Sequence, residues 1–331
     1  MPNFRHALVV ALALAAVGGG AGAQDGPPAP LCDLLAAHPF DPDRFGEGVM
    51  FDRIDGERAV SACEEAVAAE PNNLRLAYQL GRALARVERT DEAVAQLRRA
   101  ADAGRIAAMY ALGDLLVYHD GGKSNAAAEG VSWIRRAADA GFVPAIVGLA
   151  TLYAEGRGVT RDDATADSYY RRAAETGNPY AQLQAGLRLD DRAGNDATQL
   201  AEAERLLRAA AAQSWRDAYN ELAWFLYTRD RDMAEAERFA RRAVAAFPEE
   251  AASADTLGAI LLRRGQAAEA LVYLEFAASS EDDNPDYAER HGDALWALNR
   301  RDEAREAWND ALSNTRSDTQ RQRLRERIAR Q

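Results

Sequence analysis

The sequence contains few of the residues on which most enzymes depend. Lys123 is its single lysine, and only four histidines and two cysteines occur among 331 residues. No His-Glu-x-x-His helix, Gly-x-Ser-x-Gly elbow or Ser-x-x-Lys motif is present. The two cysteines do not form a Cys-x-x-Cys pair, so they do not resemble a zinc-ligand set. We therefore expect a protein that is not an enzyme and has no catalytic residues, no metal site and no cofactor.

Positive charge is also scarce. Acidic residues outnumber basic ones by 52 to 40, which gives a net charge of -12. Nonspecific binding to nucleic acid requires clustered positive charge, so the composition excludes nucleic acid as a partner. The exception is residues 316–330, where six arginines accompany two acidic residues. Leu324 and Ile328 are four residues apart there and predict a C-terminal capping helix in residues 315–331, with a docking tail as the alternative.

Long apolar runs are absent except near the N-terminus. Arg5 precedes an apolar run over residues 7–17, which ends in three glycines and then Ala21-Gly22-Ala23. The run is about half the ~20 residues that a membrane-spanning helix needs, and the pattern is typical of a secretory signal peptide. We expect residues 1–23 to be a signal peptide cleaved after Ala23, a periplasmic or secreted location, and no membrane span after cleavage. An uncleaved membrane anchor is the alternative.

An export signal would bring the two cysteines into an oxidising compartment. There we expect Cys32 and Cys63 to form an intramolecular disulfide that restricts the unfolded chain, with two buried thiols as the alternative. Cys32 lies in residues 24–58, which we expect to be a flexible and irregular N-terminal segment. From residue 31 onward this segment is interpreted as a lid over the first repeat. Its aromatic residues either cover that repeat or contact a ligand, and they are Phe40, Phe45 and Phe51.

The sequence does contain an internal repeat. The heptapeptide Arg-Arg-Ala-Ala-Asp-Ala-Gly occurs at residues 98–104 and 135–141, and it returns as Arg-Arg-Ala-Ala-Glu-Thr-Gly at 171–177. Extended in both directions, the register recurs in steps of 33 to 37 residues between positions 64 and 308. Such a period is typical of solenoids, in which each unit stacks on its neighbours. We expect an all-α solenoid over residues 59–314.

A second marker runs in phase with the first. Each unit has a small residue among large apolar ones, at Gly81, Gly113, Ala150, Gly186, Ala223, Gly258 and Gly292. A second small residue comes later in most units and is followed by apolar residues at helical spacing. These small residues are Ala93, Ala166, Ala203, Ala236, Ala270 and Ala304. The two markers predict two helices per unit, with the small residue of the first helix allowing a close approach to the second.

These units are similar to two repeat families. One unit resembles a Sel1-like repeat through Ala145, Leu149, Tyr153, Gly156, Gly158, Val159, Ala166, Tyr170, Ala173, Ala174 and Gly177. The shorter units resemble tetratricopeptide repeats, especially residues 255–277 and 287–312. The resemblance covers residues 59–312 and implies a helix-turn-helix solenoid that binds or scaffolds other proteins. It does not identify a partner, because both families serve many purposes.

In arrays of this kind the first helix of each pair lines the concave face, where we expect a partner to bind. The positions three before and one after the small residue are four apart, so they share one side of that helix. They are Tyr78 and Arg82, Tyr110 and Asp114, Asn220 and Trp224, and Glu289 and Asp293. Aromatic anchors beside amide and carboxylate groups suit an extended peptide. Packing between repeats and ordinary solvation are the alternative explanation for the same residues.

Two classes of function follow from these observations. The first is a protein-protein interaction adaptor or scaffold that holds a protein or peptide partner on its concave face. The alternative is a binder of cell-wall glycan or of a small ligand that assists an envelope enzyme, with the aromatic side chains stacking on sugar rings. Retention on isolated peptidoglycan, and its loss on Trp224→Ala, would separate the two.

Overall fold

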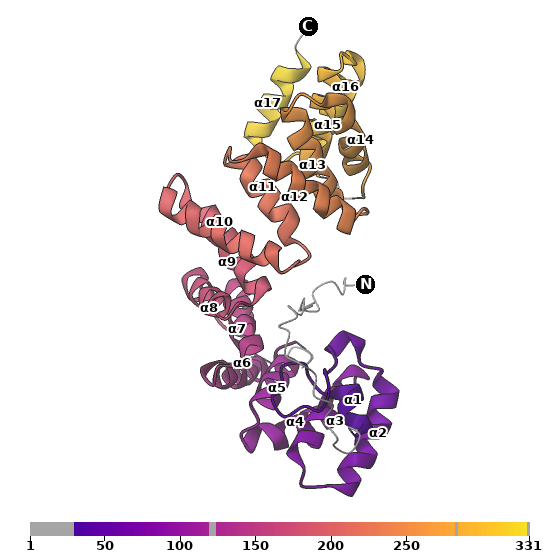
Figure 1. The fold of residues 1–331 in the computed structure, drawn as a ribbon, viewed down its shortest axis with the longest axis vertical. Coiled ribbons are helices and arrows are strands. Elements are labelled where there is room, and N and C mark those ends of the chain that lie inside the picture. The colour runs from indigo at the N-terminus through magenta and orange to yellow at the C-terminus, as the bar shows by residue number, and fades with distance from the viewer. Residues whose placement is uncertain (1–29, 119–123, 282–283, 330–331) are drawn as a thin grey trace, which may run out of the picture. The chain divides into compact units, whose positions relative to one another are not determined.

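Every regular element of the described chain is a helix. The computed structural model describes residues 30–118, 124–281 and 284–329, and no strand occurs in these ranges. The chain divides into two compact units, Met1–Ala185 and Gly186–Gln331, in each of which consecutive helices pack together (Figure 1). The predicted all-α fold of stacked helix pairs is confirmed. None of the described helices has the length and apolar character required to cross a membrane, and the predicted signal peptide lies outside the described residues.

Unit 1 contains the N-terminal segment and the first helix pairs. Its elements are α1 (Leu31–Ala36), a 3-10 helix (Phe51–Arg53), α2 (Gly56–Ala69), α3 (Leu74–Arg86), α4 (Thr90–Asp102), α5 (Ile106–Tyr118), α6 (Ser124–Asp139), α7 (Val143–Glu155), α8 (Asp163–Glu175) and the start of α9 (Pro179–Ala193). Helices α3 with α4, α5 with α6 and α7 with α8 form pairs. The first helices also contact one another, α3 with α5 and α5 with α7.

Unit 2 repeats this arrangement. Its elements are the remainder of α9, then α10 (Ala197–Ala212), α11 (Ala218–Thr228), α12 (Met233–Ala246), α13 (Ala251–Arg263), α14 (Ala267–Ala278), α15 (Pro285–Ala297), α16 (Arg301–Asn314) and α17 (Asp318–Ile328). Helices α11 with α12, α13 with α14 and α15 with α16 form pairs, and the first helices α11, α13 and α15 contact in turn. The C-terminal helix α17 packs against α16.

In five of the helix pairs, a glycine of the first helix lies directly against a large side chain of the second helix. A Cβ added at Gly258 would lie 2.4 Å from Leu274 Cγ, and one added at Gly81 would lie 2.6 Å from Leu97 Cγ. Leu274 stands four residues after Ala270, the fully buried small residue of α14. The same contact recurs at Gly113 with Ile134, Gly186 with Leu207 and Gly292 with Trp308. The predicted close approach within each of these pairs is therefore confirmed.

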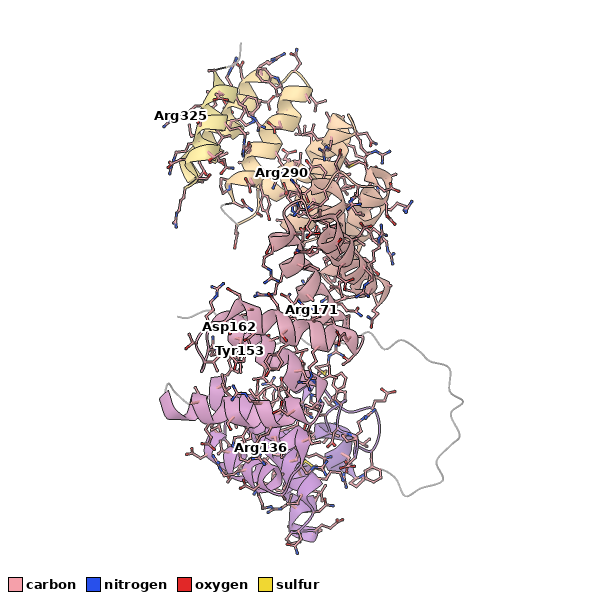
Figure 2. The ribbon with its side chains drawn as sticks, turned by 90° about the vertical axis from the view of Figure 1, so that its left-hand side faces the viewer. Arg136, Tyr153, Asp162, Arg171, Arg290 and Arg325 are labelled. Atoms are coloured by element: carbon pink, nitrogen blue, oxygen red, sulfur yellow. A yellow bond between two sulfur atoms is a disulfide. The ribbon has the colours of Figure 1, made fainter. Side chains whose placement is uncertain are left out.

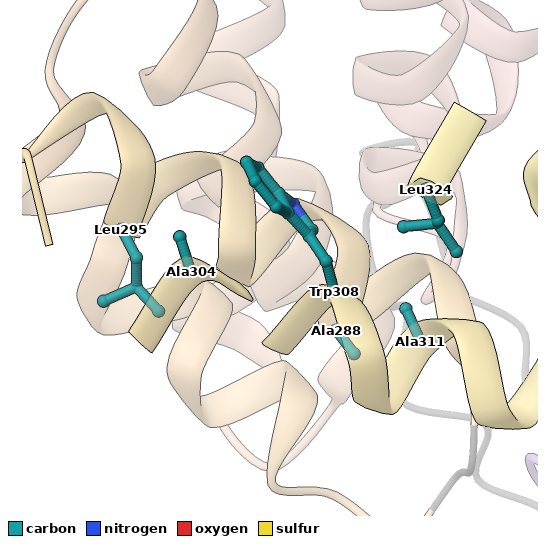
Figure 3. Close-up of a cluster of buried hydrophobic side chains, with 6 residues drawn as sticks. All are labelled: Ala288, Leu295, Ala304, Trp308, Ala311 and Leu324. Carbon is teal, nitrogen blue, oxygen red and sulfur yellow. The ribbon is translucent and has the colours of Figure 1, made fainter. Parts of the chain in front are cut away.

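The last helix pair shows how this contact builds a core. A cluster of buried side chains joins α15, α16 and α17 (Figure 3), and its members are Ala288, Leu295, Ala304, Trp308, Ala311 and Leu324. The indole of Trp308 fills the space left by Gly292, and its Nε1 donates a hydrogen bond to the Glu289 carbonyl at 3.2 Å. Leu324 is fully buried, so α17 shares the core of the last pair.

The Sel1-like unit has the loop that its glycines predict. Between α7 and α8, Gly156 and Gly158 have φ values of 70° and 68°, in the left-handed region that favours glycine. The backbone N–H of Asp162 donates to the Tyr153 carbonyl at 2.9 Å, and both residues are labelled in Figure 2. The Asp162 carboxylate then accepts a hydrogen bond from the Thr165 N–H at 3.0 Å and caps α8.

The N-terminal segment is covalently attached to the first repeat. Cys32 of α1 and Cys63 of α2 form the predicted disulfide, both residues are buried, and their Cα atoms are 4.7 Å apart. The bridge closes a separation of 31 residues, for which the lost entropy of the unfolded chain corresponds to about 3–4 kcal/mol. The segment was expected to be irregular, but it contains α1, which also packs against α3.

The close approach of α13 and α14 gives a first prediction. Gly258→Ala should lower the free energy of unfolding by about 1–3 kcal/mol, because the new methyl group must displace Leu274. In a Leu274→Ala background the same substitution should cost nothing, since the space is then empty and alanine favours a helix by ~1 kcal/mol. Urea unfolding of the four proteins of this cycle measures the coupling. An equal effect of Gly258→Ala in both backgrounds would contradict the contact.

Candidate functional site

The eight predicted partner-binding residues all lie on first helices, two on each. Helices α3 and α5 of unit 1 and helices α11 and α15 of unit 2 carry them. The side of these helices that carries the eight residues is called the first-helix face of each unit. The structure places the four pairs in different surroundings. The α3 pair and the α15 pair are in contact with other parts of the same chain, whereas the α5 and α11 pairs are partly open.

The α3 pair is covered by the N-terminal segment. Tyr78 is 1% exposed and Arg82 is 3% exposed. The Arg82 guanidinium donates hydrogen bonds to the carbonyl oxygens of Ala36 and Val49, the latter at 2.8 Å. Burial raises the pKa of Tyr78 to about 12, so its hydroxyl is neutral at physiological pH. Arg82 therefore holds the chain's own N-terminal segment on α3, whereas Tyr78 lies buried with its ring centroid 6.0 Å from the Arg105 guanidinium.

Two aspartates of that segment reinforce the attachment. The buried Asp33 carboxylate accepts hydrogen bonds from Arg75 and from Gln79 Nε2, the latter at 2.6 Å. The buried Asp41 carboxylate accepts from Arg105 at 2.9 Å. Sequence reasoning missed both residues, because an aspartate in a proline- and glycine-containing segment gives no signal of a distant arginine. These ion pairs and the disulfide fix the segment across α3 as far as the start of α5.

The aromatic residues of the segment are placed in two ways. Phe40 lies beside His38, with ring centroids 5.7 Å apart, and its N–H donates to His38 Nδ1. Phe45 and Phe51 remain 50% and 42% exposed, although the Arg75 guanidinium lies 4.7 Å from the Phe45 ring centroid. Phe40 is therefore half-buried beside His38 of its own segment, whereas the other two rings keep substantial surface open to solvent.

The α15 pair is covered by the C-terminal helix. Glu289 is 4% exposed, and its carboxylate accepts hydrogen bonds from Arg323 at 2.6 and 2.7 Å, from Arg327 at 2.7 Å and from Gln320 at 2.8 Å. Burial opposes ionisation, but the hydrogen bonds from Arg323 and Gln320 and the charge of Arg327 lower the pKa of Glu289 below its usual value. Asp293 also pairs with Arg327, at 2.7 Å. The arginines predicted to form a capping helix thus bind two of the predicted site residues.

The α5 pair shares one side of its helix with a second tyrosine. Tyr110, Asp114 and Tyr118 are spaced four residues apart, so they share one side of α5, and all three are half-buried. The Tyr110 ring packs against Phe142, with centroids 5.7 Å apart. No ion pair to Asp114 occurs among the residues that the structure describes. Desolvation raises the pKa of Asp114 to about 6.

The α11 pair lies beside an ion pair of the neighbouring first helices. Trp224 packs against Tyr227 with centroids 5.4 Å apart, and the Arg290 guanidinium, labelled in Figure 2, lies 5.4 Å from the Trp224 ring centroid. Arg290 makes two hydrogen bonds of 2.7 Å to the Asp255 carboxylate. Asn220 Oδ1 is buried and accepts no hydrogen bond within the described part of the chain. This pair therefore combines an aromatic ring with an unsatisfied amide oxygen.

The cover over α15 gives a second prediction. Glu289→Gln should weaken the attachment of α17 by about 2–4 kcal/mol, because a neutral amide cannot compensate the two arginines. Trypsin should then cleave at the arginines of α17 much faster than in the parent protein. Asp302→Asn is the matched control, because the Asp302 carboxylate is 97% exposed and its pairing with Arg305 contributes little. Unchanged cleavage in the Glu289 variant would contradict the assigned role.

The desolvated Asp114 gives a third prediction. The Asp114 carboxyl has a higher pKa in the folded chain than in the unfolded chain, so its ionisation lowers the free energy of unfolding. This effect is complete above about pH 7 and absent below about pH 4. Asp114→Asn should therefore be more stable than the parent at pH 7.5 by about 1–2 kcal/mol, with the difference vanishing near pH 4. Urea unfolding across this pH range provides the measurement. A difference that does not depend on pH would rule out the carboxylate as its source.

Comparison with known proteins supports the fold. Residues 254–329 match the family model of a tetratricopeptide repeat-like domain. No curated protein sequence matches the chain. The chain resembles the crystal structure of a protective antigen, present in uropathogenic Escherichia coli strains, that displays an SLR (Sel1-like repeat) fold, with 22% identity and a TM-score of 0.63 over 78% of this chain. It spans 57% of that antigen's structure.

Two further solved structures are similar. A Sel1 repeat protein from Oxalobacter formigenes aligns with 18% identity and a TM-score of 0.55, over 73% of this chain and 98% of that protein. The Cut9–Hcn1 hetero-tetramer of the APC/C aligns with 16% identity and a TM-score of 0.53, over 82% of this chain and 52% of the other. At these identities the likeness concerns the fold. The chain therefore has the helical repeat fold of Sel1-like and TPR proteins, and its residues 254–329 match a tetratricopeptide repeat-like domain.

Proposed function

We propose that the protein is a periplasmic or secreted adaptor that binds a protein or peptide partner on its first-helix face. The observation that carries this proposal is that the face already binds polypeptide from the same chain. In unit 1 it holds the N-terminal segment through hydrogen bonds from Arg82 to two carbonyl oxygens. In unit 2 it holds a helix through carboxylate-arginine pairs to Glu289. A surface with this chemistry is suited to an extended peptide or a helix of a partner.

The middle first helices offer the part of the face that remains available. Tyr110 and Asp114 in unit 1, and Asn220 and Trp224 in unit 2, are half-buried rather than sealed. Each pair combines an aromatic ring with a polar group that lacks full compensation, namely the Asp114 carboxylate and Asn220 Oδ1. Such groups reduce stability unless a partner satisfies them. We assign partner binding to these two pairs, each acting within its own unit.

The location rests on two features. A disulfide such as Cys32–Cys63 persists in oxidising compartments and is uncommon in a reducing cytosol. Residues 1–23 have the composition of a secretory signal peptide. Both support a mature chain that begins near residue 24 and acts outside the cytoplasm.

The surroundings of Trp224 favour a polypeptide over a cell-wall glycan. Sugar rings stack on open aromatic faces, but Tyr227 packs against Trp224 and Arg290 lies over its ring. Arg290 is in turn held by Asp255, so clearing the ring would break an ion pair. Glycan binding therefore stays the second candidate and is an outcome of the test below.

A peptide-display selection on the oxidised mature chain, residues 24–331, tests the proposal. Selected peptides should bind the parent protein and lose at least about ten-fold in affinity when Tyr110 and Trp224 are replaced by alanine, since aromatic anchors dominate such interfaces. The control variant carries Asp102→Asn and Tyr169→Ala on the second helices α4 and α8 and should bind normally. Equal losses in both variants would exclude the first-helix face. Retention on isolated peptidoglycan without peptide binding would overturn the proposal in favour of the glycan alternative.

A further inference from the structure

The second helix α14 carries a row of exposed apolar residues. Val272 is 65% exposed, more than any other large apolar side chain of the described residues, and Phe276 is 42% exposed. Ala268 is exposed as well, and the three residues are spaced four apart, so they lie along one side of α14. The buried side of the helix carries Ala270 and Leu274 instead. The exposed row, called the α14 row, is therefore not part of the core of unit 2.

The second helices before and after α14 carry charges where α14 carries this row. Positions can be compared by counting from the buried alanine of each second helix, because that alanine recurs in register. At the positions equivalent to Val272 and Phe276, α12 has two exposed arginines and α16 has two exposed acidic residues. They are Arg238 and Arg242 on α12, and Glu306 and Asp310 on α16. The second-helix face of unit 2, defined by these four residues and the α14 row, is thus basic at one edge and acidic at the other.

Contacts within unit 2 place α14 between the two charged helices. Arg241 of α12 donates a hydrogen bond to the Glu269 carboxylate of α14 at 2.7 Å. Leu271 of α14 packs against the buried cluster that includes Trp308 of α16. The Arg238 side chain is 69% exposed, and its contact with Glu235 at 3.4 Å contributes little. The basic edge therefore remains available for a charge from outside the chain.

We infer that the second-helix face of unit 2 binds the same face of a second copy of this chain. A two-fold axis parallel to α14 brings each α14 row against its counterpart and places α12 of each copy opposite α16 of the other. Arg238 then faces Glu306 of the partner subunit, because both residues lie at the same height along their helices. An axis across the helices would place arginine opposite arginine, which is unfavourable. The charges therefore select the parallel arrangement.

The association is expected to be weak and reversible. A stable interface covers about 800 Å² on each partner and has an apolar core. Here each copy contributes two large apolar side chains to that core. The contact uses second helices, so it leaves the first-helix face of unit 2 free. A dimer would present two such faces, which strengthens binding to a partner that has more than one binding segment.

Sedimentation velocity of the mature oxidised chain, residues 24–331, tests the inference. The weight-average mass should rise towards that of a dimer between about 5 and 500 µM, the range of a weak interface. Val272→Asp should weaken the association at least about ten-fold, because it places two carboxylates opposite each other at the axis. Leu34→Asp is the matched control, since Leu34 is 52% exposed in unit 1, and it should leave the association unchanged. Both sites are exposed, so both variants should keep the helicity of the parent.

An exchange of charges tests the arrangement of the two copies. Arg238→Glu and Glu306→Arg should each weaken the association at least about three-fold, because each places like charges opposite one another. The double variant restores opposite charges at both edges and should associate within about two-fold of the parent.

Three results would overturn the inference. They are a chain that stays monomeric over the whole concentration range, a dimer that persists in Val272→Asp, and a double variant that associates as weakly as the single variants. The adaptor function is tested separately by the peptide selection and does not depend on any of these results.

Discussion

The contact between a glycine of a first helix and a large side chain of the second helix underlies the rest of the structure. Because Gly81, Gly113 and Gly258 lack a side chain, the facing helix can place Leu97, Ile134 or Leu274 directly against the backbone. The two helices of a pair then bury their apolar sides together, and neither could do so alone. Repetition of the contact at nearly constant spacing sets the first helices side by side within each unit. The first-helix face, and every proposal made for it, depends on that repetition.

The face is used by the protein itself at two places. The N-terminal segment covers α3 and is held by the disulfide, by Arg82 and by two aspartate-arginine pairs. The C-terminal helix covers α15 and is held by Glu289 and by Leu324. Terminal repeats of a solenoid need such covers, because their apolar and polar surfaces lack a neighbouring repeat. Helix α5 carries Asp114, whose carboxyl pKa is raised to about 6 by desolvation, and perturbed pKa values are frequent at functional positions.

The sequence predicted the periodic features of the fold and missed the contacts between distant segments. The repeat register, the two helices per unit and the positions of close approach follow from local spacing, and the disulfide follows from two cysteines beside a predicted export signal. The eight residues of the first-helix face were placed on the correct helices because an i, i+4 spacing fixes one side of a helix. The lid over the first repeat and the C-terminal capping helix were predicted, but the ion pairs that hold them were not, since nothing local in Asp33, Asp41 or Arg323 indicates a partner more than thirty residues away. The short helix α1 was missed because proline and glycine dominate its surroundings.

The central claim is that the open part of the first-helix face receives a polypeptide while the chain's own termini stay in place. Hydrogen-deuterium exchange of the mature oxidised protein, with and without a selected peptide, tests it most directly. The account predicts added protection in first helices, α5 and α7 in unit 1 or α11 and α13 in unit 2, with no change in the second helices α4, α6 and α8 or in the N-terminal segment. Protection confined to the second helices, or faster exchange of the N-terminal segment on binding, would contradict the account.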